Sequence, residues 1–132
     1  MEPFSVSHDA ADPIGINVFA GNDKATIVTD TGVISDDILR RIDDTTLLVL
    51  EANYDPHMLR FGPYQPFLKQ RVASDEGHLS NEMAAQALLM MKRPDFMQVI
   101  LAHRSENNNN SVLVTQTIGK CLLMVVFVLD LK

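Results

Sequence analysis

Residues 24–32 constrain this chain more than any other part of the sequence. Residues 25–28 form an uncharged, largely β-branched run that is typical of a buried strand, and Asp30 and Gly32 follow where the strand should end. In open α/β sheets, ligands bind beyond the carboxyl ends of the strands, so a carboxylate in this place is a candidate binding group. A capping or turn role explains a lone aspartate better, so the assignment depends on what other strand ends carry.

Two histidines also follow predicted strands. His8 comes after residues 4–7, and His103 comes after residues 97–102. Taken singly, a histidine at a strand end is more often a hydrogen-bonded structural residue than a metal ligand. Together, however, one carboxylate and two imidazoles are ligands suited to zinc, manganese or iron, provided that one fold brings the strand ends together. The sequence therefore predicts a metal site built from His8, Asp30 and His103.

The order of the predicted elements indicates an α/β domain. A hairpin over residues 14–30 follows the first strand, and helices and strands then alternate, which favours parallel pairing of the later strands. The later elements are a helix after Ser35, a strand over 46–51, short helical pieces between 55 and 71, a helix over 80–92, a strand over 97–102, a helical turn over 111–118 and a strand over 122–129.

Composition supports one folded domain and argues against some classes of function. The 132 residues are 46% hydrophobic and carry a formal charge of −6, which is unlike a basic surface that coats nucleic acid. An enzyme that reaches nucleic acid through metal ions and a few local cations remains compatible with this charge. Because the single cysteine, Cys121, cannot form an internal disulfide and no signal peptide or membrane span is evident, we expect a cytoplasmic chain.

Five segments occur in an order that resembles a known family. They cover residues 6–13, 29–32, 50–55, 77–82 and 101–108. Together they are similar to the carboxy-terminal half of the metallo-β-lactamase-fold hydrolases of the YycJ (WalJ) type, which are associated with metal-dependent DNA exonuclease activity. The resemblance runs from about residue 4 to residue 118. It implies an α/β fold that is part of an αββα sandwich, mainly one sheet with its helices.

The resemblance implies a role for each of the three predicted ligands. His8 corresponds to the histidine that completes the first metal site, Asp30 to the aspartate that bridges both metals, and His103 to a ligand of the second metal. Two divalent ions, zinc or manganese, would hold a hydroxide near neutral pH and stabilise the attacking and leaving oxygens during phosphodiester cleavage. DNA is the partner that the family implies.

Further polar residues would surround the ligands. In the loop of residues 77–82, His78 is the candidate for a catalytic side chain, and Ser80 and Asn81 would orient substrate; capping of the helix that follows explains these residues at least as well. Residues in the segment 50–55 would contact the ligands and hold them in orientation, with ordinary hydrogen bonding at the strand end as the alternative. The supporting residues are Glu51, Asn53 and Asp55.

The chain lacks the family's His-x-His-x-Asp-His motif, which lies in the amino-terminal half and supplies two ligands to each metal. We therefore expect residues 1–132 to be a single partial domain with weak or absent metal binding. The sheet face that should meet the other half would carry apolar side chains, so self-association or pairing through this face is expected. Two other functions stay open, a non-catalytic α/β remnant or interaction domain and a metallo-hydrolase acting on a non-nucleic substrate.

Overall fold

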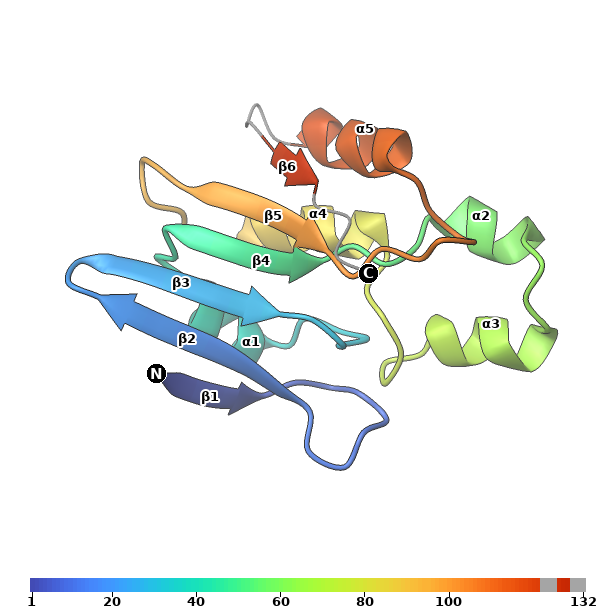
Figure 1. Ribbon diagram of the computed structural model, residues 1–132, viewed down its shortest axis with the longest axis horizontal. Helices are drawn as coiled ribbons and strands as arrows, with labels where there is room; N and C mark the ends of the chain where they lie inside the picture. Colours follow the sequence, from blue (N-terminus) through green and yellow to red (C-terminus); the bar gives the residue numbers. More distant parts are fainter. Residues whose placement is uncertain (122–125, 129–132) are drawn as a thin grey trace.

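The computed structural model describes residues 1–121 and 126–128, which form one mixed sheet with helices (Figure 1). The strands lie side by side in sequence order, from β1 (Glu2–Ser5), β2 (Ile14–Ala20) and β3 (Asp23–Val28) to β4 (Leu47–Glu51), β5 (Gln98–Ala102) and β6 (Val126–Val128). β1, β2 and β3 pair antiparallel, whereas β3 to β6 pair in parallel. The predicted hairpin and the predicted parallel pairing are confirmed. Of the strand expected over 122–129, residues 122–125 and 129 lie outside the described residues.

The first strand ends earlier than the sequence suggests, at Ser5 instead of residue 7. Its last partner is Ile14, and the residue before that partner is Pro13. The N–H of Val6 donates to the carbonyl of Pro13 at 3.1 Å, but proline has no N–H to return the bond. Regular pairing therefore stops, and the chain reaches His8 through a loop.

The helices begin where the sequence places their caps. The Ser35 hydroxyl accepts a hydrogen bond from the N–H of Ile38 and starts α1 (Asp36–Ile42), and Asp55 caps α2 (Pro56–Phe61) in the same way. Ser80 caps α4 (Asn81–Met90). The other two helices of the described residues are α3 (Pro66–Val72) and α5 (Ser111–Cys121). None of the helices in this part of the chain has the length and apolar character needed to cross a bilayer.

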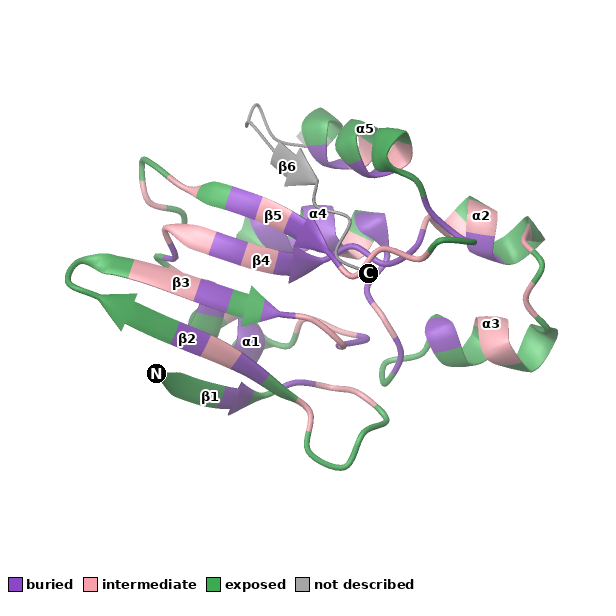
Figure 2. Ribbon diagram, in the orientation of Figure 1, coloured by how far each residue is buried: buried purple, intermediate pink, exposed green. Residues whose placement is uncertain are grey.

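One face of the sheet is covered by α1, α4 and α5. Alternate strand residues point toward these helices, as the two-residue period of a strand requires. They pack with Ile38, Leu88 and Ile118 of the three helices in one buried cluster (Figure 2). The strand residues of this cluster with at most 1% of their surface exposed are Val28, Leu48, Leu50, Val99 and Leu101.

The opposite face of the sheet carries apolar side chains that the described residues leave open to water. A row of paired residues runs across it from Ile16 to Ile27, then to Val49 and Ile100. Ile27 is 41% exposed. A row of β-branched residues in contact with water is typical of a surface that packs against another layer. This surface, termed the bare sheet face, consists of Ile14, Ile16, Val18, Ile27, Val49 and Ile100.

The isolated chain is expected to associate through the bare sheet face, and Ile27→Lys is expected to shift it toward the monomer. A lysine at the centre of this face would be buried without a partner in any face-to-face complex, which costs free energy. Size-exclusion chromatography with light scattering measures the change, and Leu89→Lys on the outer side of α4, where Leu89 is 49% exposed, is the matched control. A compact, cooperatively melting monomer before any substitution would contradict the prediction.

α2 and α3 lie beyond the carboxyl ends of the central strands, at one end of the sheet (Figure 1). They are held by a small cluster of their own, in which Tyr54, Leu59 and Val72 are buried. Tyr64 and Leu68 pack against this cluster. The two helices therefore form a wall beside the strand ends, where ligands bind in sheets of this kind.

Candidate metal centre

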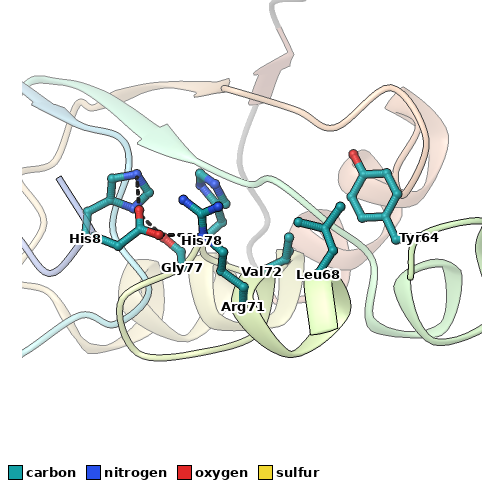
Figure 3. Close-up of a pocket in the computed structure, with 8 residues that line it drawn as sticks. His8, Tyr64, Leu68, Arg71, Val72, Gly77 and His78 are labelled. Carbon is teal, nitrogen blue, oxygen red and sulfur yellow. Dashed lines mark hydrogen bonds and ion pairs between the residues drawn. The ribbon is translucent and has the colours of Figure 1, made fainter. Parts of the chain in front are cut away.

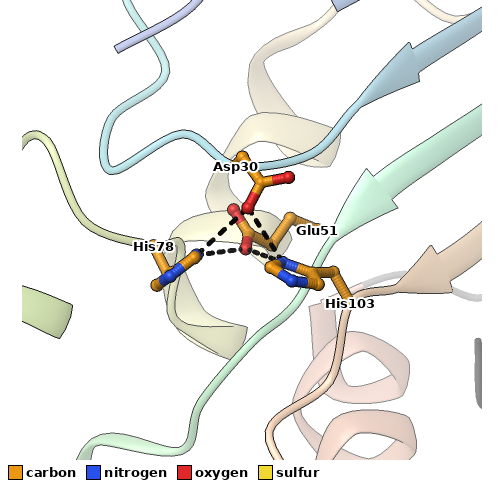
Figure 4. A group of neighbouring side chains, drawn as sticks. All are labelled: Asp30, Glu51, His78 and His103. Carbon is orange, nitrogen blue, oxygen red and sulfur yellow. Dashed lines mark hydrogen bonds and ion pairs between the residues drawn. The ribbon is translucent and has the colours of Figure 1, made fainter. Parts of the chain in front are cut away.

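Four candidate metal ligands meet at one edge of the sheet, three of them at the carboxyl ends of parallel strands (Figure 4). Asp30 follows β3, Glu51 is the last residue of β4, and His103 follows β5. His78 comes from the loop that precedes α4. One potential ligand atom of each residue lies within 4.8 Å of those of the other three. Parallel strands explain this meeting, because all three end at the same edge of the sheet.

His8 lies at the edge of this cluster. Its Nε2 is 3.9 Å from Oδ1 of Asp30, and its ring centroid is 5.1 Å from that of His78. Its Nδ1–H donates a hydrogen bond to the carbonyl oxygen of Gly77 at 3.0 Å, which leaves the lone pair of Nε2 on the side of Asp30. The structure thus places all three predicted ligands, His8, Asp30 and His103, at one end of the sheet.

Glu51 is fully buried and holds the other two imidazoles in place. Its Oε1 accepts a hydrogen bond from Nδ1 of His78 and one from Nδ1 of His103, each at 2.7 Å. Its Oε2 accepts the backbone N–H of Thr31 at 3.1 Å and that of Leu79 at 3.4 Å. A carboxylate that binds Nδ1–H fixes the orientation of the ring and leaves Nε2 for a metal or a proton.

The surroundings of Glu51 keep it ionised. Burial raises the pKa of Glu51, but the hydrogen bonds from His103 and His78 outweigh burial, so the pKa lies below its ordinary value. The hydrogen bond that His103 donates to Glu51 raises the pKa of His103, against the opposing effect of partial burial. A buried anion with two imidazoles on one oxygen is therefore the fixed centre of the cluster.

Two of the predicted ligands have an uncommon backbone conformation. Asp30 has φ of 55° and His103 has φ of 56°, in the left-handed region that few residues other than glycine adopt. Asp44, in a turn at the other end of the sheet, shares this conformation with φ of 56°. Strained backbone of this kind concentrates at functional sites, and its occurrence at Asp30 and His103, two of the three strand-end candidate ligands, supports such a role.

The other predicted site residues differ in their distance from the ligands. Asn53 donates from Nδ2 to the carbonyl oxygen of His103 at 2.7 Å and so holds the turn that carries this ligand. Asn81 is buried away from the ligands and exchanges amide hydrogen bonds with Asn109 at 2.9 and 2.8 Å. Ser80 has the helix-cap role that the sequence left open for it, and Asp55 caps α2.

The cluster opens into a pocket of about 530 Å³, lined by His8, Asp30, His78 and His103 together with Tyr64 and neighbouring residues. A second pocket of about 270 Å³ lies between His8 and α3 (Figure 3). Arg71 of α3 forms an ion pair with Asp9, which ties α3 to the loop that carries His8. No sequence pattern indicated this ion pair, because the two residues belong to separate segments.

The contacts of Glu51 with both histidines were also missed by sequence analysis, which treated each residue separately. One signal was present in the sequence. Glu51 ends a run of uncharged residues over 45–50, and a carboxylate at the end of a buried strand requires partners. The identity of those partners could not be deduced from the sequence.

Comparisons with known proteins agree with this fold. No family model matches the sequence. Exodeoxyribonuclease YycJ of Bacillus anthracis is 38% identical over 122 residues, which are 92% of this chain and 46% of the relative. Exodeoxyribonuclease WalJ of Streptococcus pneumoniae is 37% identical over 117 residues, which are 89% of this chain and 44% of the relative. The chain thus spans about half the length of the curated relatives it matches.

Two solved structures share the fold at low sequence identity. The metallo-β-lactamase-fold protein YhfI of Bacillus subtilis has a TM-score of 0.71 at 13% identity, covering 97% of this chain and 45% of YhfI. Zinc-bound PqqB of Methylobacterium extorquens has a TM-score of 0.64 at 15% identity, covering 97% of this chain and 47% of PqqB. The predicted α/β fold is confirmed. The chain is therefore a homologue of part of the exodeoxyribonucleases YycJ and WalJ, and its sheet and helices are part of a metallo-β-lactamase fold.

Proposed function

We propose that this chain forms one side of the metal centre of a hydrolase that cleaves phosphodiester bonds in DNA. One observation supports the proposal above all others: the rings of His8 and His103 flank Oδ1 of Asp30, with Nε2 of His8 at 3.9 Å and Nδ1 of His103 at 3.5 Å. Because Nδ1–H of His103 is bonded to Glu51, Nε2 of this ring is the nitrogen left for an ion. Two imidazoles and a carboxylate fit zinc or manganese. DNA as the substrate is supported by the names of YycJ and WalJ, which are exodeoxyribonucleases.

His8, Asp30 and His103 are the residues that would hold a divalent ion in this chain. When bound, the ion supplies a hydroxide near neutral pH and stabilises charge on the phosphate oxygens. Three protein donors equal the number that catalytic zinc sites retain. The resemblance, however, assigns His8 and His103 to different ions that share Asp30, so the three residues are not a set built for one ion. This is why we expect weak binding by the chain alone.

The role of Glu51 in this proposal is to position the two imidazoles that it binds. With Nδ1–H of His103 fixed on the carboxylate, the ring of this ligand cannot turn away from the pocket. His78 has the same hydrogen bond, and its ring lies 5.1 Å from the rings of both His8 and His103. His78 lines both pockets, and its ring, once Nε2 has taken up a proton while Nδ1–H stays on Glu51, would give that proton to the leaving oxygen of a bound phosphodiester.

Hydrolysis of a labelled DNA strand with added manganese or zinc tests this function. Asp30→Asn should reduce the rate at least about 100-fold, because it removes charge at the reacting centre. Asp44→Asn is the matched control, since both aspartates have left-handed backbone and asparagine tolerates this conformation. The chain is assayed alone and with the amino-terminal half of YycJ added. Equal rates for the two variants, or cleavage that persists in EDTA, would contradict the proposed function.

The bare sheet face favours a second candidate function, that of a non-catalytic interaction domain. We propose that its occupant is another β-layer, from the part of the relatives' sequence that lies outside the match. The match covers 46% of YycJ, so more than half of the relative remains to supply such a layer. Metal content separates the two functions. A bound ion supports the hydrolase, whereas a folded complex without metal supports the interaction domain.

A further inference from the structure

The segment that contains α2 and α3 has a charge opposite to that of the whole chain. Residues 56–73 contain Arg60, Lys69 and Arg71 and no Asp or Glu, although the chain has 17 acidic and 11 basic residues. The segment also carries three aromatic rings, those of Phe61, Tyr64 and Phe67. We term this segment the aromatic arm. Its composition is that of a surface for an anionic ligand with flat apolar groups.

The outer rings of the aromatic arm are open to water. Phe61 is 67% exposed and Phe67 is 70% exposed, on the two sides of the turn that joins α2 to α3. The two helices pack through other residues, so neither ring is needed in their core. The Arg60 guanidinium lies 5.4 Å from the centre of the Phe61 ring, and the His57 ring lies 4.7 Å from it. A cation, the Arg60 guanidinium, is thus already placed beside an exposed ring.

The aromatic arm is continuous with the candidate metal centre. Tyr64 and Arg71 line the same pocket as His8 and His78 (Figure 3). Arg71 is paired with Asp9, so its charge is partly compensated. Lys69 donates from Nζ to the carbonyl oxygen of Arg60 at 2.8 Å, a bond that holds the ammonium group near Arg60 without neutralising it. The outer part of the aromatic arm therefore combines two phenylalanine rings with two cations.

We propose that the aromatic arm binds single-stranded DNA that leaves the metal centre, with bases stacked on Phe61 and Phe67 and phosphates near Arg60 and Lys69. This inference rests on the proposed function and specifies its substrate. Stacking on aromatic side chains accepts any base, and basic residues follow the backbone, which together bind a strand without sequence preference. The bases of an intact duplex are stacked on one another and cannot use the two rings. The substrate is accordingly a single strand or the unpaired end of a duplex.

Fluorescence anisotropy of a labelled single-stranded oligonucleotide tests the proposal, with the full chain in EDTA so that no hydrolysis is required. Phe61→Ala and Phe67→Ala should each weaken binding at least about fivefold, as loss of a stacked base does. Phe61→Trp should retain binding, whereas Phe61→Leu should not, because leucine is apolar but has no flat ring. Phe96→Ala is the matched control, since Phe96 is 74% exposed and precedes β5 at the other end of the sheet.

Three outcomes would overturn the proposal. The first is unchanged binding of the oligonucleotide by the two alanine variants. The second is full binding by Phe61→Leu, which would indicate an apolar protein partner. The third is a blunt duplex that binds as tightly as the single strand and loses as much affinity in the phenylalanine variants. Because both rings are exposed, the variants should melt like the original chain, which circular dichroism checks. The two proposals can fail separately. If the phenylalanine variants bind DNA more weakly but Asp30→Asn does not affect cleavage, the proposal for the aromatic arm stands and the proposal for the metal centre is contradicted.

Discussion

Replacement of Glu51 by alanine is expected to lower the free energy of unfolding by about 3 kcal/mol or more. Glu51 is fully buried, and its loss removes the acceptor of the Nδ1–H groups of His78 and His103. The backbone N–H of Thr31 loses its acceptor as well. Stability of a domain is typically about 5 to 15 kcal/mol, so this change would remove a large part of it. Urea unfolding followed by circular dichroism measures the effect, at one protein concentration because the chain is expected to associate.

Glu51→Gln separates the charge of this residue from its shape. The amide oxygen can take the place of Oε1 and accept both Nδ1–H groups, but the NH₂ group in the place of Oε2 cannot accept the backbone N–H groups of Thr31 and Leu79. We therefore expect a smaller loss than for alanine. Glu82→Gln is the matched control, since Glu82 is exposed in the first turn of α4, and its effect should be within about 0.5 kcal/mol. An unfolding midpoint for Glu51→Ala equal to that of the original chain would show that Glu51 is not the structural centre of the cluster.

The parts of the fold that depend on neighbouring residues could be predicted from the sequence. Ser35, Asp55 and Ser80 cap helices through groups three positions along the chain, so short stretches contain the whole signal. The parallel order of the central strands followed from the alternation of helices and strands. The meeting of Asp30 and His103 followed in turn, because side chains at the carboxyl ends of parallel strands share one edge. His8 follows β1, which runs in the same direction as β3 because each of them pairs antiparallel with β2.

The parts that depend on distant contacts could not be predicted. Glu51 binds His78 across 27 residues and His103 across 52 residues, and no local pattern specifies which of several strand-end groups will meet. The same holds for the ion pair of Arg71 with Asp9, 62 residues apart. Sequence analysis therefore proposed donors for the site, whereas the orientations of the rings emerged from the structure.

The second large effect is expected on metal binding. Equilibrium dialysis against zinc or manganese should load the chain weakly with one ion, and His103→Ala or His8→Ala should weaken this binding by more than about 100-fold. Loss of a residue that merely orients a ligand typically costs 10- to 100-fold, and these two histidines are proposed to be the ligands themselves. His57→Ala should leave the affinity unchanged, because His57 lies on α2 against Phe61.

The outcome of this experiment also decides between the two candidate functions. Equal metal affinities for the three histidine variants would place any bound ion elsewhere. A folded chain that binds no metal, but forms a complex through the bare sheet face, would support the interaction domain. Either result is compatible with the fold described above, since the core beneath α1, α4 and α5 is separate from the metal centre and from the bare sheet face.

Anomalous diffraction from crystals soaked in manganese or zinc tests the central claim most directly, namely that His8, Asp30 and His103 converge as metal ligands. We predict an anomalous peak bonded to the Asp30 carboxylate and to the imidazoles of His8 and His103, at the end of the sheet where β3 and β5 stop. Peaks confined to other sites, with these three side chains turned away from one another, would contradict it.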